Sequence, residues 1–220
     1  MLKRGFDFIS SLIGLVVLTP VFGVIALAIK RDSEGPVFFA GERIGRDGKL
    51  FKILKFRTMV ESPEAHNGPR INTRDDARIT RLGRFLRDSK LNELPQLINV
   101  LRGEMTLVGP RPCLPYEAEE YLRWHKNRFD IRPGITGLWQ VSGKNKLPFK
   151  QMIRLDISYL RNLSLWLDIK ILLLTFPAIV QFVFDAVKNQ IRGYKVTESP
   201  TVESETLTIC QILETFAERF

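Results

Sequence analysis

The stretch Asn92-Glu93-Leu94-Pro95 places a carboxylate where a helix is expected to begin. If Asn92 caps that helix, Pro95 falls in its first turn, where a missing backbone donor costs little. Glu93 would then lie at the positive end of the helix dipole, in arginine-rich surroundings. A carboxylate in that position can bind a metal ion or a metal–phosphate complex, although glutamate in a first turn is also ordinary capping chemistry.

Gly109-Pro110-Arg111-Pro112 holds one guanidinium between two prolines. Because proline fixes the backbone, Arg111 loses less entropy when it binds a phosphate through two parallel hydrogen bonds. The alternative is a surface loop with a solvated arginine. Lys55 and Arg57, at the end of an expected hairpin, and the stretch Arg132-Pro133-Gly134 add further cations near turns.

Turn residues and apolar spacing predict the elements that position these groups. Asp47-Gly48 between two extended runs predicts a β-hairpin within residues 42–56, preceded by a short strand at 37–39. Residues 60–75 are predicted to form a long loop, which is usually a functional or mobile one. Helices are predicted over residues 79–86, over 92–101 with Gly103 ending it, from Pro115 onward, and over 149–160.

Asp156 lies on an otherwise apolar stripe of the last of these helices. A carboxylate on a face that packs into a protein interior is costly to bury unless it is paired. We therefore expect Asp156 to have a partner.

A run of 22 residues without charge, Phe8 to Ile29, lies between Lys3-Arg4 and Lys30-Arg31. Its length suits a helix that crosses the hydrocarbon core, but Pro20 removes a backbone donor near its middle. We expect a kink or break at Thr19-Pro20, with the Thr19 hydroxyl satisfying a freed backbone group. Because positive residues flank both ends, a re-entrant hairpin with both ends on the cytoplasmic side is expected.

Three other interpretations of this segment stay open: a transmembrane anchor that tolerates the proline, a signal peptide and a buried core helix. Ala26-Leu27-Ala28 favours a signal peptide, but the apolar region is too long for one and Lys30-Arg31 follows at once. A core helix that is apolar all round needs more surrounding protein than 220 residues offer.

Ile171 to Phe184 is a second uncharged stretch, of 14 residues, interrupted by Pro177. It is too short to span a membrane, so we expect it in the membrane interface or packed into the core. Apolar spacing in the last residues predicts an amphipathic helix that packs on the body or on a second copy, as in a homodimer. We divide the chain into a membrane hairpin (1–31), a catalytic domain (32–192) and a tail (193–220).

The expected fold class is α+β: mostly helices and a small β-hairpin, with interfacial amphipathic helices and a helix-break-helix at the amino end. Of the 220 residues, 45% are hydrophobic and 26% charged, which is typical of a folded chain with one sizeable core. A net charge of +9 suits a polyanion, an anionic membrane face or a phosphate-rich substrate. Cys113, Cys210, His66 and His125 lack the spacing of a disulfide framework or a zinc site.

Three motifs together resemble the bacterial sugar transferase family, the monotopic phosphoglycosyl transferases. They are residues 55–59 (KFRTM), 91–112 (LNELPQLINVLRGEMTLVGPRP) and 132–137 (RPGITG), in the order that the family has. The resemblance runs over about residues 1–190 and includes a re-entrant helix with a Ser-Pro type of break. It implies transfer of a phosphosugar from a UDP-sugar to polyprenyl (undecaprenyl) phosphate, with release of UMP, at the cytoplasmic face of the bacterial inner membrane.

In that family an adjacent Asp-Glu pair works with Mg²⁺, and the Asp attacks the β-phosphate to form a covalent phosphosugar intermediate. By position Glu93 matches the Glu of the pair, and the resemblance makes residues 92 and 93 the catalytic and metal-binding pair. Substrate binding is then expected of Lys55, Arg57, Arg87, Arg111 and Asp156.

The nucleophile position of this chain holds Asn92. A neutral amide cannot form the acyl phosphate and is a poor magnesium ligand. Four accounts stay open: a substituted, trapped form of an active enzyme, a natural member that uses Glu93 or direct transfer, an inactive relative, and an assignment of roles that is shifted by one residue.

Two other classes of function compete with an enzyme. A membrane-bound relative without activity could hold lipid phosphate or recruit glycosyltransferases, and Asn92 is the best argument for it. A nucleic-acid-binding protein would explain the basic charge, but it leaves the 22-residue apolar run and both proline-rich motifs unexplained. No nucleic acid partner is therefore expected.

Overall fold

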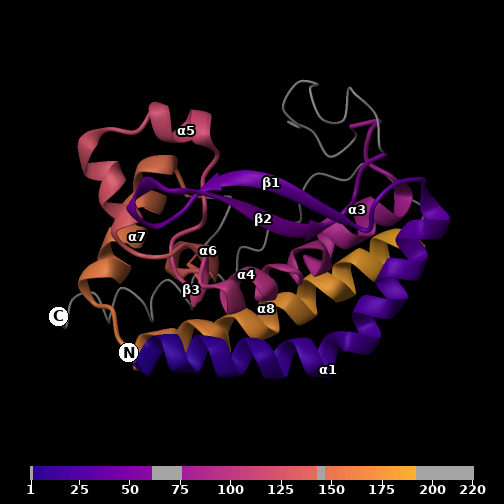
Figure 1. The fold of residues 1–220 in the computed structure, drawn as a ribbon, viewed down its shortest axis with the longest axis horizontal. Coiled ribbons are helices and arrows are strands. Elements are labelled where there is room, and N and C mark those ends of the chain that lie inside the picture. Colours follow the sequence, from indigo (N-terminus) through magenta and orange to yellow (C-terminus); the bar gives the residue numbers. More distant parts are fainter. Residues whose placement is uncertain (1, 61–75, 143–146, 192–220) are drawn as a thin grey trace.

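The computed structural model of the chain describes residues 2–60, 76–142 and 147–191. Two long helices, α1 (Leu2–Asp32) and α8 (Leu165–Ile191), run along one side of the molecule, and a β-hairpin lies on the other (Figure 1). Some of the short helices and a second pair of strands lie between these two layers, and other short helices lie at the left end of the view. The described part is mostly helical with little β-structure, in agreement with the predicted α+β class.

The predicted hairpin is confirmed. Strands β1 (Phe38–Ile44) and β2 (Leu50–Phe56) pair antiparallel, and the strand expected at 37–39 is the beginning of β1. The connection is the 3-10 turn η1 (Arg46–Gly48), in which Asp47 and Gly48 both have positive φ, of 57° and 74°. Aspartate and glycine tolerate this conformation, which explains why the Asp-Gly pair marks the turn.

The four predicted helices are present, with shorter bounds than expected for some. They are α3 (Arg81–Asp88), α4 (Gln96–Arg102), α5 (Pro115–Glu119) and α7 (Phe149–Arg161). Gly103 ends α4 in the left-handed conformation, as predicted. Three short elements complete the helices of the body: η2 (Leu91–Glu93), η3 (Arg123–Asp130) and α6 (Leu138–Val141).

One predicted boundary is wrong: Asn92 does not cap α4. It lies within the 3-10 turn η2, and Pro95 occupies the residue before the first helical position of α4. Lys90, with a φ of 63°, turns the chain between α3 and η2. The backbone hydrogen bonds here span three residues, as in a 3-10 helix: the Leu94 N–H donates to the Leu91 carbonyl at 3.2 Å and the Leu97 N–H donates to the Leu94 carbonyl at 3.1 Å.

Strands β3 (Thr106–Val108) and β4 (Gly134–Thr136) pair in parallel and bring two of the sequence motifs together. The Gly109 N–H donates to the Thr136 carbonyl at 2.9 Å, and the Gly134 N–H donates to the Pro110 carbonyl at 2.8 Å. A Cβ on Gly134 would lie 2.1 Å from the Gly109 nitrogen. The backbones approach so closely that only glycine fits there.

The predicted break in the first helix is wrong as secondary structure, because helix α1 continues through Pro20. It is nevertheless bent: its first part runs beneath the body and its last part turns up along the side (Figure 1). The proline, which removes one helical hydrogen bond, accounts for such a bend. The Thr19 hydroxyl donates to the Leu15 carbonyl at 2.8 Å, one residue before the Val16 carbonyl that Pro20 leaves without its usual donor.

Helix α8 is longer than the uncharged stretch within it. It includes Pro177 and reaches 27 residues, because charged residues extend it at both ends. At about 1.5 Å per residue it is roughly 40 Å long, so the expectation that this region is too short to span a membrane does not apply to the whole helix. By length and composition, α1 and α8 could each cross a membrane.

Both helices bury polar residues beside apolar ones where they touch the body, and both expose many large apolar side chains. The buried residues of α1 include Asp7 and Ser11, and Asp168 of α8 is 1% exposed. Large apolar side chains point outward instead, at Phe8, Ile9, Leu12, Ile13, Val16, Val17, Val24 and Leu27 of α1 and at Trp166, Leu173, Phe176, Val180 and Phe184 of α8. A water-soluble protein has the opposite arrangement.

Candidate active site

Three elements bring Lys55, Glu93 and Arg111 to one cleft. Lys55 lies near the end of β2, Glu93 ends η2 and Arg111 follows β3. The Lys55 Nζ is 3.1 Å from the Glu93 Oε1, and the Arg111 Nη1 is 3.9 Å from the same oxygen. The cleft is lined by Arg43, Ile53, Lys55, Glu93, Gln96, Arg111, Pro112, Gly134 and Ile135.

Burial and charge act in opposite directions on Glu93. Burial raises the pKa of Glu93. The charges of Lys55 and Arg111 and the hydrogen bond from Lys55 lower it by a larger amount, so that the pKa is about 2. Burial also lowers the pKa of Lys55, and the charge of Glu93 counters that effect. The cleft therefore holds an ionised carboxylate, which can bind a cation. The two cations beside it can bind an anion.

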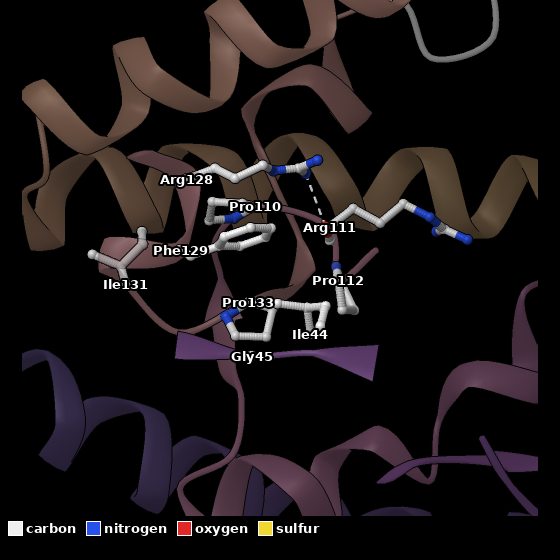
Figure 2. A pocket seen from close by; sticks show the side chains of 9 residues that line it. All are labelled: Ile44, Gly45, Pro110, Arg111, Pro112, Arg128, Phe129, Ile131 and Pro133. Carbon is white, nitrogen blue, oxygen red and sulfur yellow. Dashed lines mark hydrogen bonds between the residues drawn. The ribbon is translucent and has the colours of Figure 1, made fainter. Parts of the chain in front are cut away.

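The loop around Arg111 is fixed from behind by a buried ion pair. Arg128 donates to the Arg111 carbonyl at 2.8 Å, and its guanidinium pairs with the Asp156 carboxylate at 2.6 Å. Figure 2 shows Arg111 between Pro110 and Pro112, with its side chain extending away from Arg128. The backbone is held on one side of the loop while the Arg111 guanidinium is left for the cleft on the other.

Asp156 has the partner that its apolar stripe predicted. It is 1% exposed and does not line the cleft. Burial raises its pKa to about 6, against the opposing effect of Arg128. Its role in substrate binding stays a prediction, and this geometry indicates that it would act through Arg128 and the Arg111 backbone.

Arg57 and Arg87 do not line this cleft. Arg57 is buried and donates to the carbonyls of Ser33, at 2.7 Å, and Glu34, so it fastens the end of α1 to the hairpin. The Arg87 Nε donates to the Thr58 hydroxyl at 2.8 Å. Their predicted contact with substrate stays a prediction.

Asn92 precedes Glu93 and is 8% exposed. Its side-chain Oδ1 is buried, and none of the residues that the structure describes donates a hydrogen bond to it. A buried acceptor without a donor is costly and uncommon in folded proteins. Asn92 does not line the cleft, so a ligand there would reach this oxygen only after a local rearrangement.

Comparison with known proteins identifies the family. Residues 1–182 match the family of bacterial sugar transferases. The chain belongs to that family.

Three relatives illustrate what this bacterial sugar transferase is similar to. The galactosyl transferase CpsE of Streptococcus agalactiae serotype III (strain NEM316) is 40% identical over 189 residues, which are 81% of this chain and 42% of that protein. The exopolysaccharide production protein ExoY of Rhizobium meliloti (strain 1021) is 39% identical over 193 residues, 81% of this chain and 85% of ExoY. The UDP-glucose:undecaprenyl-phosphate glucose-1-phosphate transferase of Klebsiella pneumoniae is 40% identical over 183 residues, 79% of this chain and 39% of that enzyme. This chain thus spans about two fifths of the first and third relatives and most of the second.

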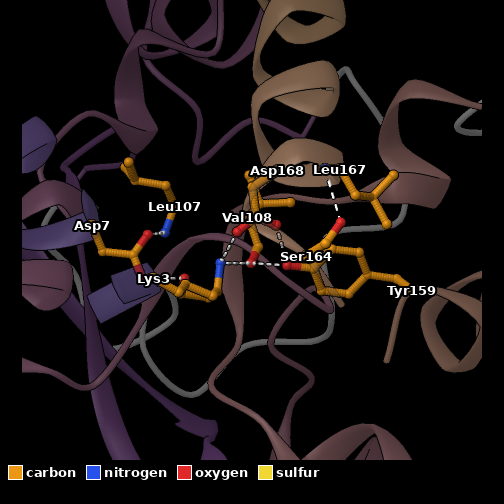
Figure 3. Close-up of polar contacts among 9 residues, drawn as sticks. Lys3, Asp7, Leu107, Val108, Tyr159, Ser164, Leu167 and Asp168 are labelled. Atoms are coloured by element: carbon orange, nitrogen blue, oxygen red, sulfur yellow. Dashed lines mark hydrogen bonds and ion pairs between the residues drawn. The ribbon is translucent and has the colours of Figure 1, made fainter. Parts of the chain in front are cut away.

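The amino end of α1 in this bacterial sugar transferase is fastened to α8 and to the strand before Arg111 (Figure 3). The Lys3 Nζ pairs with the Asp168 carboxylate at 2.6 Å and donates to the Val108 carbonyl at 3.1 Å. The Tyr159 hydroxyl lies 2.5 Å from the same carboxylate and 2.9 Å from the same carbonyl. Burial raises the pKa of Tyr159, which keeps its hydroxyl protonated as a donor.

Sequence reasoning missed several members of the site. Arg128 and Asp168 gave no signal, because their partners lie far away in the sequence and come from elements whose packing no local pattern predicts. Arg43 could have been found from the predicted hairpin, since alternate residues of paired strands share a face with Lys55.

Proposed function

We propose that this bacterial sugar transferase has the cleft of an enzyme that moves a sugar phosphate from a UDP-sugar to polyprenyl phosphate and releases UMP, and that Asn92 lowers or abolishes this turnover in the native chain. The reaction would be the first membrane step of a bacterial glycoconjugate pathway, at the cytoplasmic face of the inner membrane. Relatives whose names specify a sugar phosphate transferase and undecaprenyl phosphate support this class of reaction.

The observation that carries the proposal is the cleft around Glu93. In this cleft Arg111 stands between two prolines, and Arg128 fixes the Arg111 backbone. Arg111 therefore loses little conformational entropy when it binds a phosphate. Lys55 adds a second cation 3.1 Å from the carboxylate. Fixed cations of this kind neutralise the charge that develops on a transferring phosphoryl group.

We also propose that α1 is inserted in the membrane without crossing it. Arg4 donates to the carbonyls of Val100 and Leu101, at 2.6 and 2.9 Å, and thereby binds the amino end of α1 to α4. At the other end, Arg57 binds the carbonyls that follow α1. Since both ends are fastened to the same polar body, the two ends are expected on the same side of the bilayer, with the apolar outer faces of α1 and α8 in contact with lipid.

Mg²⁺ is part of the proposal, and the residues present suit it only together with a substrate. Within the described ranges, no three His, Cys, Asp or Glu side chains come together as a metal site. Glu93 offers one carboxylate, and the Asn92 Oδ1 lacks a donor. Magnesium is commonly held by one or two carboxylates plus substrate phosphates, so Glu93 and a diphosphate would hold it with the Asn92 amide as a weak further ligand, and the ion would neutralise phosphate charge.

A second candidate is a relative without turnover that retains lipid phosphate or a partner protein. The specific observation in its favour is Asn92, whose amide cannot act as the nucleophile that the family resemblance implies.

The test is release of UMP by the full chain in nanodiscs with Mg²⁺, undecaprenyl phosphate and a panel of UDP-sugars. We expect little or no turnover of the native chain, and an increase of about 10³-fold or more in Asn92→Asp, because the substitution supplies a carboxylate nucleophile. Asn162→Asp, which changes an exposed asparagine, is the matched control and should leave the rate unchanged.

Two outcomes would contradict these assignments. Native turnover that persists in Glu93→Gln would remove Glu93 from the mechanism. If Asn92→Asp releases no UMP from any donor although it is folded, the transferase proposal is wrong and the non-catalytic candidate is favoured.

A further inference from the structure

The cleft around Glu93 carries more positive charge than its own carboxylate balances. Three cations line it, Arg43, Lys55 and Arg111, against the single carboxylate of Glu93 among its lining residues, which is a net charge of +2. Charge left without a partner in a partly buried place is costly. An anionic ligand would remove that cost.

Arg43 is the member of this group that no motif indicated. It lies on β1 opposite Phe51, and Gly41, two residues before it, lies opposite Ile53. Since alternate residues of paired strands share a face, Arg43 lies on the face of the hairpin that carries Ile53 and Lys55. That face forms a wall of the cleft.

The guanidinium of Arg43 is only partly engaged. Its Nη1 donates to the carbonyl of the preceding residue, Glu42, at 2.6 Å. No carboxylate in the described part of the chain lies within ion-pair distance of it, although the charge of Glu117 acts on it from farther away. Burial lowers the pKa of Arg43 and the charge of Arg111 lowers it further, so the two guanidinium groups repel each other in the cleft.

We propose that Arg43 binds a phosphate of the nucleotide diphosphate and that, together with Arg111, it holds this group from two different elements, β1 and the loop after β3. This inference rests on the proposed function. A diphosphate beside both guanidinium groups would replace their repulsion by two attractive contacts, and guanidinium forks suit phosphate oxygens. Arg43 would then set donor affinity, with Glu93 left beside the reacting phosphate.

The experiment is calorimetric titration of UDP into the full chain in nanodiscs with Mg²⁺. We expect Arg43→Ala to weaken UDP binding about 10- to 100-fold, the usual effect of losing a charge-assisted hydrogen bond. Arg43→Lys, which keeps the charge and loses the fork, should recover part of that affinity. Arg46→Ala removes an exposed arginine in the turn of the same hairpin and should bind UDP like the native chain.

The outcomes separate this inference from the function on which it rests. If the native chain does not bind UDP, the proposed function fails. If it binds UDP and Arg43→Ala binds as tightly, or if Arg46→Ala loses as much affinity as Arg43→Ala, the role of Arg43 is wrong and the proposed function stands. Thermal unfolding of each variant decides whether a loss of affinity reflects a loss of fold, and a folded Arg43→Ala with native affinity overturns the inference.

Discussion

At the scale of single residues, the site depends on carboxylates whose environments differ. Glu93 lies beside two cations and has a pKa of about 2, whereas Asp156 is almost fully buried behind Arg128 and has a pKa of about 6. At neutral pH the pKa of Glu93 lies far below the pH, whereas the pKa of Asp156 lies only a little below it. Such divergence is common where residues are arranged for chemistry.

The acidic pKa of Glu93 predicts how stability depends on pH. Its pKa falls from 4.5 to about 2 on folding, so the folded state binds this proton less tightly than the unfolded state does. Glu93 therefore stabilises the fold above pH 4.5, by up to about 3 kcal/mol, and this contribution is lost as the pH falls through 2. We expect Glu93→Gln to lower the free energy of unfolding at pH 7 by up to that amount and to flatten its acid dependence.

Thermal unfolding in detergent at several pH values between 2 and 7 measures this effect. Glu42→Gln, on the exposed face of the hairpin, is the control and should follow the native profile within about 0.5 kcal/mol. An acid dependence of Glu93→Gln that matches the native one would show that this carboxylate does not stabilise the fold.

At the scale of elements, local patterns predicted what local forces decide. The hairpin follows from Asp47-Gly48 and the end of α4 from Gly103, because each depends on a backbone conformation that few residues adopt. The start of α4 and the continuity of α1 were not predictable in the same way. A 3-10 turn before Pro95 and a helix that tolerates Pro20 both depend on packing against distant segments, which a sequence pattern does not contain.

In the candidate site, too, some residues could be predicted from local sequence and others depend on distant segments. Lys55, Glu93 and Arg111 were all predicted, and the structure brings them together. Their supports were not predicted, because Arg128 reaches Arg111 and Lys3 reaches Asp168 across long stretches of chain.

The contact between α1 and α8 predicts a large effect for Lys3→Met. The substitution leaves the buried Asp168 carboxylate without its cation, which is expected to cost about 3 kcal/mol of unfolding free energy. Thermal unfolding in detergent measures it. Arg31→Met, an exposed cation at the other end of α1, is the control and should change stability by less than about 0.5 kcal/mol. Equal stability of the two variants would mean that the Lys3 pair contributes nothing.

At the scale of the whole molecule, the apolar surface defines how the protein meets a bilayer. The outer faces of α1 and α8 lie on the same side of the body, opposite the hairpin (Figure 1). A body that rests on lipid by this side would keep the hairpin on the side that faces water.

Cysteine labelling tests this orientation. In a chain with Cys113 and Cys210 replaced by serine, Leu2→Cys and Asp32→Cys mark the two ends of α1, and Lys49→Cys marks the hairpin turn as a control. We expect an impermeant maleimide to label all three in inverted membrane vesicles and none in intact spheroplasts, because both ends of α1 are bound to the body. Labelling of Leu2→Cys from the outside alone would mean that α1 crosses the membrane.

The contacts of Asp7 have a consequence for the order of events during synthesis. Its carboxylate accepts hydrogen bonds from the Thr106 hydroxyl, at 2.6 Å, and from the Leu107 N–H, at 3.1 Å, about 100 residues further along the chain. A ribosome adding about 5–20 residues per second needs roughly 5–20 s to supply those partners. During that interval the apolar helix leaves the ribosome with the Asp7 carboxylate unpaired near its start. Hydration of this carboxylate keeps that end of the helix at the interface between water and lipid until Thr106 and Leu107 have been synthesised.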